Sequence, residues 1–345
     1  METFNDHTAT INLKILKQYG FYQMLDPNSK KIFGWNVYWI FFIILTLITE
    51  CLICFGNFGF FLELEDTIDA TDLFLIIFSN LLSHSASLKM IILIINRKKI
   101  LDLLDVTDLI FLKSRPCRDN IKILYTHCSR ALQLTNIYFY TVAIVLFEWI
   151  IFPIIVNSFI EYNNANQRLD NVINRQYPVG VNTYNKYYIL FYVFEITIGI
   201  KSVYLVLMID VLLLSIGWAI TVQYEVLAAA FKNIGHNKNL QKDHNYDVVD
   251  DYKCFKSILF DQQELDVKLK LYFSIVKPIV LMHVAIWSGI IIMMSNSFIM
   301  VFLSTESFTY KIVNLFKIGT GILLMCIQLF LYCHLFDNIN LKRKN

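Results

Sequence analysis

Long apolar runs alternate with shorter polar segments along the whole chain. Six of these runs hold about 20 residues or more, which is the length that a helix needs to cross a hydrocarbon core of ~30 Å. They cover residues 35–61, 72–96, 132–160, 187–220, 271–303 and 310–336. The pattern predicts an all-α, polytopic membrane helical bundle that forms a single domain over residues 1–345.

Three of the runs continue as helix-compatible sequence far beyond one crossing, over residues 118–162, 187–232 and 255–303. A helix of about 45 residues reaches nearly 70 Å at ~1.5 Å per residue, more than twice the hydrocarbon thickness. The excess segments are amphipathic. In the third of them an apolar stripe is formed by Ile258, Leu265, Leu269 and Phe273, while Asp261, Glu264 and Lys268 are expected to face water. These extensions are either ordinary loop helices or, as we expect, a bundle outside the membrane in which protein packs on protein.

The amino-terminal stretch TINLKILKQYGFYQML, residues 10–25, is too short and too polar to span a membrane. We expect an interfacial helix that lies along the inner leaflet. Residues 1–30 contain no apolar core before a small-residue cleavage site, so we expect no secretory signal to be removed.

Composition and charge agree with this membrane topology. Apolar residues make up 56% of the chain and charged residues only 17%, against about 45–50% and 25% in soluble domains. Residues 1–34, 97–131, 223–270 and 338–345 hold 22 Lys and Arg residues, whereas the connections on the other side hold three. Because Lys and Arg flanks stay in the cytoplasm, the amino terminus and the 337–345 tail are predicted to be cytoplasmic. A G-protein-coupled receptor has the opposite orientation and seven spans.

Candidate chemistry is sparse. The seven cysteines give no disulfide or metal framework, and the pair Cys51 and Cys54 lies inside an apolar run where a redox partner has no access. Glycine-rich nucleotide loops, nucleophilic triads and zinc-protease motifs are absent from the sequence. We therefore expect no enzyme activity, cofactor, metal or nucleic-acid partner.

Four segments carry a family resemblance when they are taken in order. The segment INRKKILDLLD follows the second span, RQYPVGVNTYNKYYILFYVFE leads into the fourth, and DQQELDVKLKLYFSIVKPIVL leads into the fifth. The last is QLFLYCHLFDNIN, a Gln, apolar residues, an aromatic and a Cys before a polar exit. Together they resemble the insect odorant receptors, and the resemblance runs along nearly the whole chain.

The resemblance implies an inverted seven-helix subunit of a ligand-gated, non-selective cation channel that serves the sense of smell. Such subunits form hetero-tetramers with an odorant co-receptor, meet through their cytoplasmic bundles, and lie in the plasma membrane of olfactory neuron dendrites. In the family another cytoplasmic helix and a pore-lining seventh helix follow QLFLYCHLFDNIN, whereas here only LKRKN remains. We expect the seventh helix to be absent, through a truncated gene model or an early-stop isoform, which puts channel formation by this chain in doubt.

Three other functions stay open. A gustatory receptor shares the inverted topology and differs most in the seventh helix. A transporter would show internal repeats and a helix broken near mid-membrane, and no matching halves are present. A truncated, non-conducting regulatory subunit would assemble through the bundle and lower the number of channels.

A pocket for a small, apolar, volatile ligand is expected in the outer half of the spans, with aromatic walls and one polar handle. We single out Trp149 and Tyr192, because each offers a large apolar face and one hydrogen-bond donor. The candidate lining residues are Phe74, Phe78, Leu81, Val142, Val145, Trp149, Phe152, Tyr188, Phe191, Tyr192, Glu195, Phe316 and Lys317, with Met294, Phe298, Val313 and Thr320 near them.

Ionisable residues inside the spans are costly and rarely face lipid. Equal depths below the outer surface suggest two ion pairs, Glu195 with Lys317 and Glu148 with Lys201; alternatively, each of the four faces a water-filled vestibule by itself. Lys89 and Lys277 lie near the inner leaflet, where we expect them to snorkel toward the headgroups.

Overall fold

The computed structural model describes residues 13–62, 70–108, 110–163, 168–234, 248–303 and 308–344. Its short elements are α1 (Leu13–Gln18), α2 (Phe21–Leu25), β1 (Lys31–Ile32), β2 (Trp35–Asn36), α5 (Arg97–Leu104), η2 (Asp105–Thr107), α6 (Arg115–Asp119) and α8 (Val181–Lys186). Its long helices are α3 (Val37–Leu62), α4 (Ala70–Ile95), α7 (Ile121–Asn163), α9 (Tyr188–Asn233), α10 (Val248–Leu303) and α11 (Phe308–Lys344).

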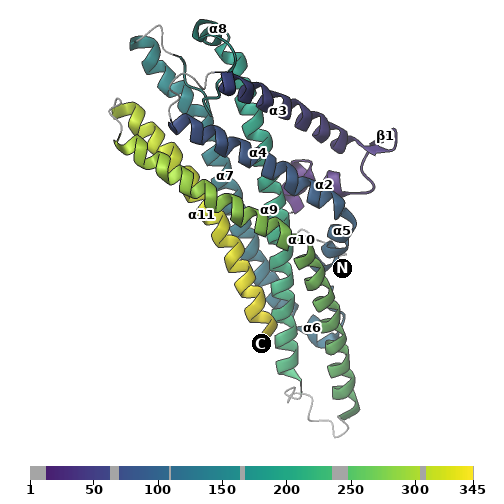
Figure 1. Ribbon diagram of the computed structural model, residues 1–345. Coiled ribbons are helices and arrows are strands. Elements are labelled where there is room, and N and C mark those ends of the chain that lie inside the picture. The colour runs from purple at the N-terminus through teal and green to yellow at the C-terminus, as the bar shows by residue number, and fades with distance from the viewer. Residues whose placement is uncertain are drawn as a thin grey trace.

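The six long helices are each long and apolar enough to cross a membrane, which confirms the number of spans predicted for the described residues. They form an elongated bundle in which α7, α9, α10 and α11 continue past α3 and α4 toward one end (Figure 1). Helix α9 is the central element: 94% of its most apolar window is buried within the protein, against 17% for α3. Helix α3 therefore exposes most of its apolar surface, which suits contact with lipid.

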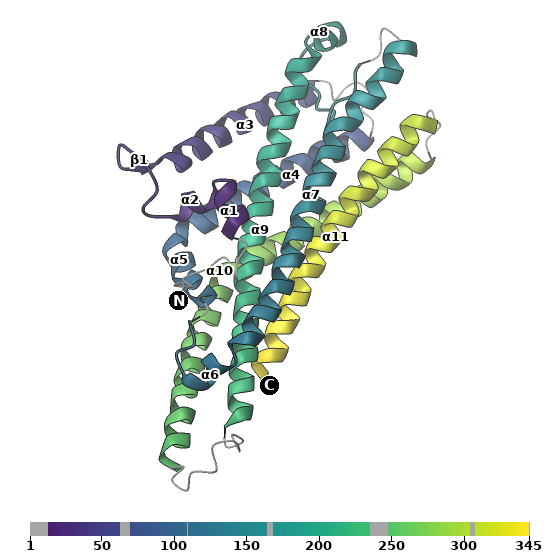
Figure 2. The same cartoon turned by 180° about the vertical axis from the view of Figure 1, so that it is seen from behind.

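The extensions of α7, α9 and α10 pack together as a helical bundle rather than running as separate loop helices (Figure 2). Helix α10 has 56 residues, which corresponds to ~84 Å of helix. Ile258, Leu265 and Leu269 of its apolar stripe are buried, as predicted. The long helices thus contain both a membrane part and a part that extends beyond it.

The polar stripe of α10 does not face water as expected. Asp261 is buried and accepts hydrogen bonds from the backbone N–H groups of Ser114, at 2.9 Å, and Lys113, at 3.2 Å. The Nζ of Lys268 donates to the carboxylate of Asp102 at 2.8 Å. The stripe instead holds α5 and the start of α6 against the bundle, because a carboxylate satisfies the free N–H groups at a helix start.

The predicted interfacial helix is also different in the structure. Within its described part it breaks at Gly20, whose φ of +77° ends α1 and starts α2. The apolar side chains of Leu16, Phe21, Met24 and Leu25 are buried in the main protein core rather than in a leaflet. Gly20 adopts the left-handed conformation of this turn without strain, and the apolar side chains of both short helices pack on the core.

Candidate ligand cavity and its polar frame

A cavity of about 100 Å³ lies among α4, α7, α9, α10 and α11, below the loop that follows α7. Its wall is apolar apart from a few hydroxyl, indole and amide groups. The lining residues are Phe78, Ser79, Leu82, Tyr138, Val142, Val145, Leu146, Trp149, Val172, Ile173, Ile198, Gly199, Ser202, Val203, Val206, Leu207, Trp287, Gly321, Leu324, Met325 and Gln328.

Four of the residues singled out from the sequence meet at this cavity: Phe78, Val142, Val145 and Trp149. The rings of Phe78 and Trp149 lie 5.6 Å apart between centroids. The indole N–H of Trp149 is buried and has no hydrogen-bond partner among the described residues.

The other nine candidates lie outside the lining: Phe74, Leu81, Phe152, Tyr188, Phe191, Tyr192, Glu195, Phe316 and Lys317. The hydroxyl of Tyr192 donates to the backbone oxygen of Ile150 at 2.5 Å, so its donor is already used. Phe191 packs against Tyr177 and Tyr184 in a separate aromatic cluster. Phe316 is 56% exposed on the outside of α11.

The connection after α7 closes the outer end of the cavity. Two charged residues from different helices hold its segment 172–175 in place. The carboxylate of Glu195 accepts the backbone N–H groups of Ile173, at 2.5 Å, and Arg175, at 3.0 Å. The Nζ of Lys317 donates to the backbone oxygen of Val172 at 2.5 Å and lies over the Trp149 ring. Glu195 and Lys317 were expected to pair with each other, and the contacts that the structure gives them here are instead to the backbone of the same loop segment.

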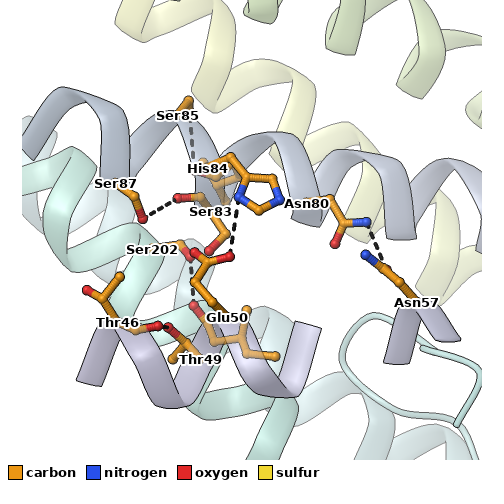
Figure 3. Close-up of polar contacts among 12 residues, drawn as sticks. Thr46, Thr49, Glu50, Asn57, Asn80, Ser83, His84, Ser85, Ser87 and Ser202 are labelled. Carbon is orange, nitrogen blue, oxygen red and sulfur yellow. Dashed lines mark hydrogen bonds and ion pairs between the residues drawn. The ribbon is translucent and has the colours of Figure 1, made fainter. Parts of the chain in front are cut away.

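Arg175 anchors this segment from within. Its side chain is fully buried, and its Nη2 donates to Ser79 Oγ at 2.6 Å and to Asn80 Oδ1 at 2.8 Å. The pKa of Arg175 is lowered by burial, and the Glu195 carboxylate opposes that shift. Asn57 of α3 and Asn80 of α4 are hydrogen-bonded to each other beside it (Figure 3). We call residues 168–180 the outer plug.

The outer plug depends on a close approach at the end of α3. A Cβ atom on Gly59 would lie 2.2 Å from the backbone oxygen of Gln176 and 2.6 Å from the nitrogen of Pro178. Because those neighbours are backbone atoms, only glycine fits here. Burial also raises the pKa of the phenols of Tyr177 and Tyr184, so both stay protonated beside the plug.

The prediction of a second ion pair, between Glu148 and Lys201, is wrong. Glu148 accepts a hydrogen bond from the hydroxyl of Thr320 at 2.9 Å. The Nζ of Lys201 donates to Ser87 Oγ at 2.8 Å and lies 3.6 Å from Glu50. Glu50 of α3 also reaches His84 of α4 (Figure 3). Equal depth did not bring the pair together, because depth leaves open which way each side chain faces around its helix.

A buried carboxylate that the sequence analysis missed lies directly under the cavity. Asp210 of α9 is fully buried and accepts hydrogen bonds from the Nζ of Lys89 at 3.3 Å and from the hydroxyl of Tyr332 at 2.6 Å. Tyr138, at 3.3 Å, and the amide nitrogen of Gln328 also donate to it. The expectation that Lys89 snorkels is therefore wrong, since it is turned inward, whereas Lys277 is exposed.

This Asp210 cluster joins four helices to the cavity floor. Lys89 comes from α4, Tyr138 from α7, and both Gln328 and Tyr332 from α11. Tyr138 and Gln328 also line the cavity. A lone ionisable residue within the apolar run 205–222 was the signal that the sequence offered. Two residues of the cavity floor are thus hydrogen-bonded to a buried carboxylate that also binds groups from other helices.

Comparison with known proteins agrees with this architecture. The sequence model of the family described as "7tm Odorant receptor" matches residues 69–340. The fold is similar to that of the insect olfactory receptor OR5 from Machilis hrabei, with a TM-score of 0.69 and 12% sequence identity. The match covers 98% of this chain and 82% of that one. No curated protein sequence matches the chain. The chain belongs to the odorant receptor family.

Proposed function

We propose that the chain is an odorant receptor subunit that binds a small volatile ligand in the cavity under the outer plug. The observation that carries this proposal is the cavity itself, because it is apolar, lies within the helical bundle, and has the aromatic side chains of Phe78 and Trp149 in its wall. Pockets for small molecules combine apolar walls with a few placed polar groups in the same way.

The size of the cavity limits the ligand. An apolar cavity of roughly 150 Å³ takes up benzene in other proteins, so about 100 Å³ holds only a very small molecule without rearrangement. Larger odorants require lining side chains to move, and Met325 is the most adaptable of them, because an unbranched thioether has several accessible rotamers. A ligand that enters must therefore change the packing around it.

We further propose that the subunit gates a non-selective cation current together with an odorant co-receptor in a hetero-tetramer of the plasma membrane of olfactory neurons. The family assignment and the extended lower bundle support this assembly. The basic connections place the amino terminus and the lower bundle in the cytoplasm in this proposal.

Recording currents from cells that co-express the chain with a co-receptor tests the proposal. An odorant panel should evoke cation current, and Val142→Trp, which fills the cavity, should abolish it while surface expression persists. Phe316→Ala is the matched control, because that side chain lies outside the lining and is exposed. Suppression of another receptor's current without any odour response would contradict the proposal and favour a non-conducting regulatory subunit.

A further inference from the structure

An exposed aromatic hairpin stands immediately before the first span. In β1 and β2, Lys31 pairs with Asn36 and Ile32 pairs with Trp35, so Phe33 and Gly34 form a two-residue loop. Both have positive φ, +51° for Phe33 and +82° for Gly34, as the favoured hairpin turns require. Phe33 is 99% exposed at the tip. A bulky residue in this left-handed conformation is strained, which points to a function for its exposed ring.

The position of the hairpin places this ring at a membrane boundary. The strand β2 ends at Asn36, and the apolar helix α3 begins at the next residue. Trp35 is 61% exposed, and the side chains of Lys30 and Lys31 are exposed beside it. Trp residues gather at the level of the lipid headgroups, where lysines keep their charge in water. Figures 1 and 2 both show the hairpin protruding from the rest of the molecule.

A second cavity, with a volume of about 580 Å³, opens between the start of α3 and the first half of α9. It is several times larger than the roughly 150 Å³ that holds benzene in an apolar site. We call it the α3–α9 groove. Its lining residues are Tyr19, Gly20, Met24, Val37, Tyr38, Phe41, Phe42, Leu45, Thr197, Ile200, Lys201, Tyr204 and Leu205.

Three of the polar side chains in the groove are already satisfied. The hydroxyl of Tyr204 donates to the backbone oxygen of Tyr19 at 2.8 Å, and that of Thr197 donates to Val193 at 2.8 Å. The ammonium of Lys201 is held by Ser87 and Glu50. Apart from the tyrosine hydroxyls of Tyr19 and Tyr38, the rest of the lining is aromatic and aliphatic surface. The groove therefore suits a hydrocarbon chain rather than a polar molecule.

The groove also has a direction relative to the membrane. Its α3 lining runs from Val37 to Leu45, which is ~12 Å along the helix starting at the boundary. A molecule in the groove would have one end in the hydrocarbon core and the other near the exposed Lys30 and Lys31. We propose that the groove binds one acyl chain of an anionic phospholipid. The headgroup of this lipid lies beside Lys30 and Lys31, and the hairpin enters the same leaflet.

Charge complementarity selects this occupant over a neutral lipid. Lys30 and Lys31 are exposed just before α3, and the backbone oxygen of Lys30 accepts the N–H of the lining residue Val37 at 3.0 Å. Their two ammonium groups attract a phosphate and carboxylate headgroup and offer less to a zwitterion. In the proposed orientation the hairpin faces the cytoplasmic leaflet, where anionic lipids are concentrated. The lipid site does not depend on odorant binding.

Photo-crosslinking of the whole chain in nanodiscs tests the proposal. Phosphatidylserine or phosphatidylcholine with a photoactivatable group on the acyl chain is incorporated, and labelled peptides are mapped by mass spectrometry. The serine lipid should label residues 37–45 and 197–205 more strongly than the choline lipid. Because lipid-facing surfaces are labelled by any lipid, the excess of serine-lipid over choline-lipid labelling is the quantity that decides. An excess that lies outside these two segments, or equal labelling of them by the two lipids, would overturn the proposal without any variant.

A pair of double variants tests the role of the headgroup. Lys30→Ala with Lys31→Ala should reduce serine-lipid labelling at least about fivefold, to the level of the choline lipid. Lys98→Ala with Lys99→Ala is the control, because it removes two exposed lysines from α5, which follows the end of α4. The serine-lipid labelling of this control should equal that of the wild type. An equal loss in both double variants would show only a general charge effect and would also overturn the proposal.

Discussion

The Nζ of Lys89 on α4 lies 3.3 Å from the carboxylate of Asp210 on α9, and both side chains are sealed from solvent. The two residues are 121 positions apart in the chain. Because a buried charge without a partner is costly, each of them fixes the position of the other. Tyr138 and Gln328 bind the same carboxylate and line the ligand cavity, so this pair sets the shape of the cavity floor.

Removing one charge of this pair should destabilise the protein strongly. Asp210→Asn leaves the ammonium of Lys89 buried without its counter-ion, and we expect a loss of ~3–5 kcal/mol in the free energy of unfolding. Thermal denaturation of the purified chain in detergent measures this loss of stability. The double variant Lys89→Met with Asp210→Leu should recover part of the loss, because no charge is then left buried. A double variant no more stable than Asp210→Asn would contradict the coupling between the two residues.

A methyl group at Gly59 should displace the outer plug. The added Cβ would meet backbone atoms of Gln176 and Pro178 at 2.6 Å or less, so the segment must move, at a cost of ~1–3 kcal/mol. Gly59→Ala should lower the melting temperature and weaken the response to odorants. Gly289→Ala is the control, since a Cβ atom there would have no neighbour within 4 Å among the described residues. Equal behaviour of the two variants would show that the close approach has no role.

A methyl group at Gly321 should make the cavity selective for smaller ligands. Its Cβ would lie 3.0 Å from the Cε of Met294 and 3.1 Å from a ring carbon of Trp149. The flexible Met294 can yield, so we expect the protein to fold while Trp149 moves toward the cavity. One methylene in an apolar pocket changes binding by about 10-fold or more. Dose–response curves for a homologous odorant series should shift most for the largest members.

Gly319→Ala is the matched control for that series. It lies two residues away on α11, and its Cβ would make only an ordinary contact, 3.8 Å from Phe298. Its dose–response curves should match those of the wild type at every chain length. A uniform shift across the series in Gly321→Ala would argue against a steric role of this position.

The outer plug should lose stability as the pH rises from strongly acidic values. Burial raises the pKa of Asp170 above its usual 3.8, although Lys317, Asn174 and Arg168 oppose the shift. A carboxyl group whose pKa is higher in the folded state binds its proton more tightly there. The contribution of this carboxyl group to the free energy of unfolding is therefore complete below the pKa that it has in the unfolded chain. The contribution is lost as the pH rises through the higher pKa that it has in the folded chain.

Asp170→Asn tests this pH dependence directly. The amide does not titrate, so the slope of the melting temperature above pH 4 should become smaller than in the wild type. Melting curves from pH 4 to pH 7 in one detergent provide the measurement. An unchanged slope would mean that Asp170 does not sense the pH in the folded plug.

The number and the approximate bounds of the membrane-spanning helices were determined by the sequence, and so was their continuation beyond the membrane. These features depend on local quantities, namely the length of each apolar run and its amphipathic period, which need no knowledge of neighbouring helices. Phe78, Val142, Val145 and Trp149 line the cavity, whereas Phe74 and Leu81, which share a predicted helix face with Phe78, do not, so the helical period alone did not identify the lining.

The partners of the charged residues were decided only by the tertiary structure. Depth along a helix follows from residue number, but the direction in which a side chain points depends on the rotation of each helix in the bundle. Lys201 therefore meets Glu50 instead of Glu148, and Asp210 meets Lys89. The return of Arg175 into the bundle likewise depends on a loop whose path no periodicity describes. Burial of a charge is stable only where several segments supply hydrogen bonds at once, and that condition exists only in the folded chain.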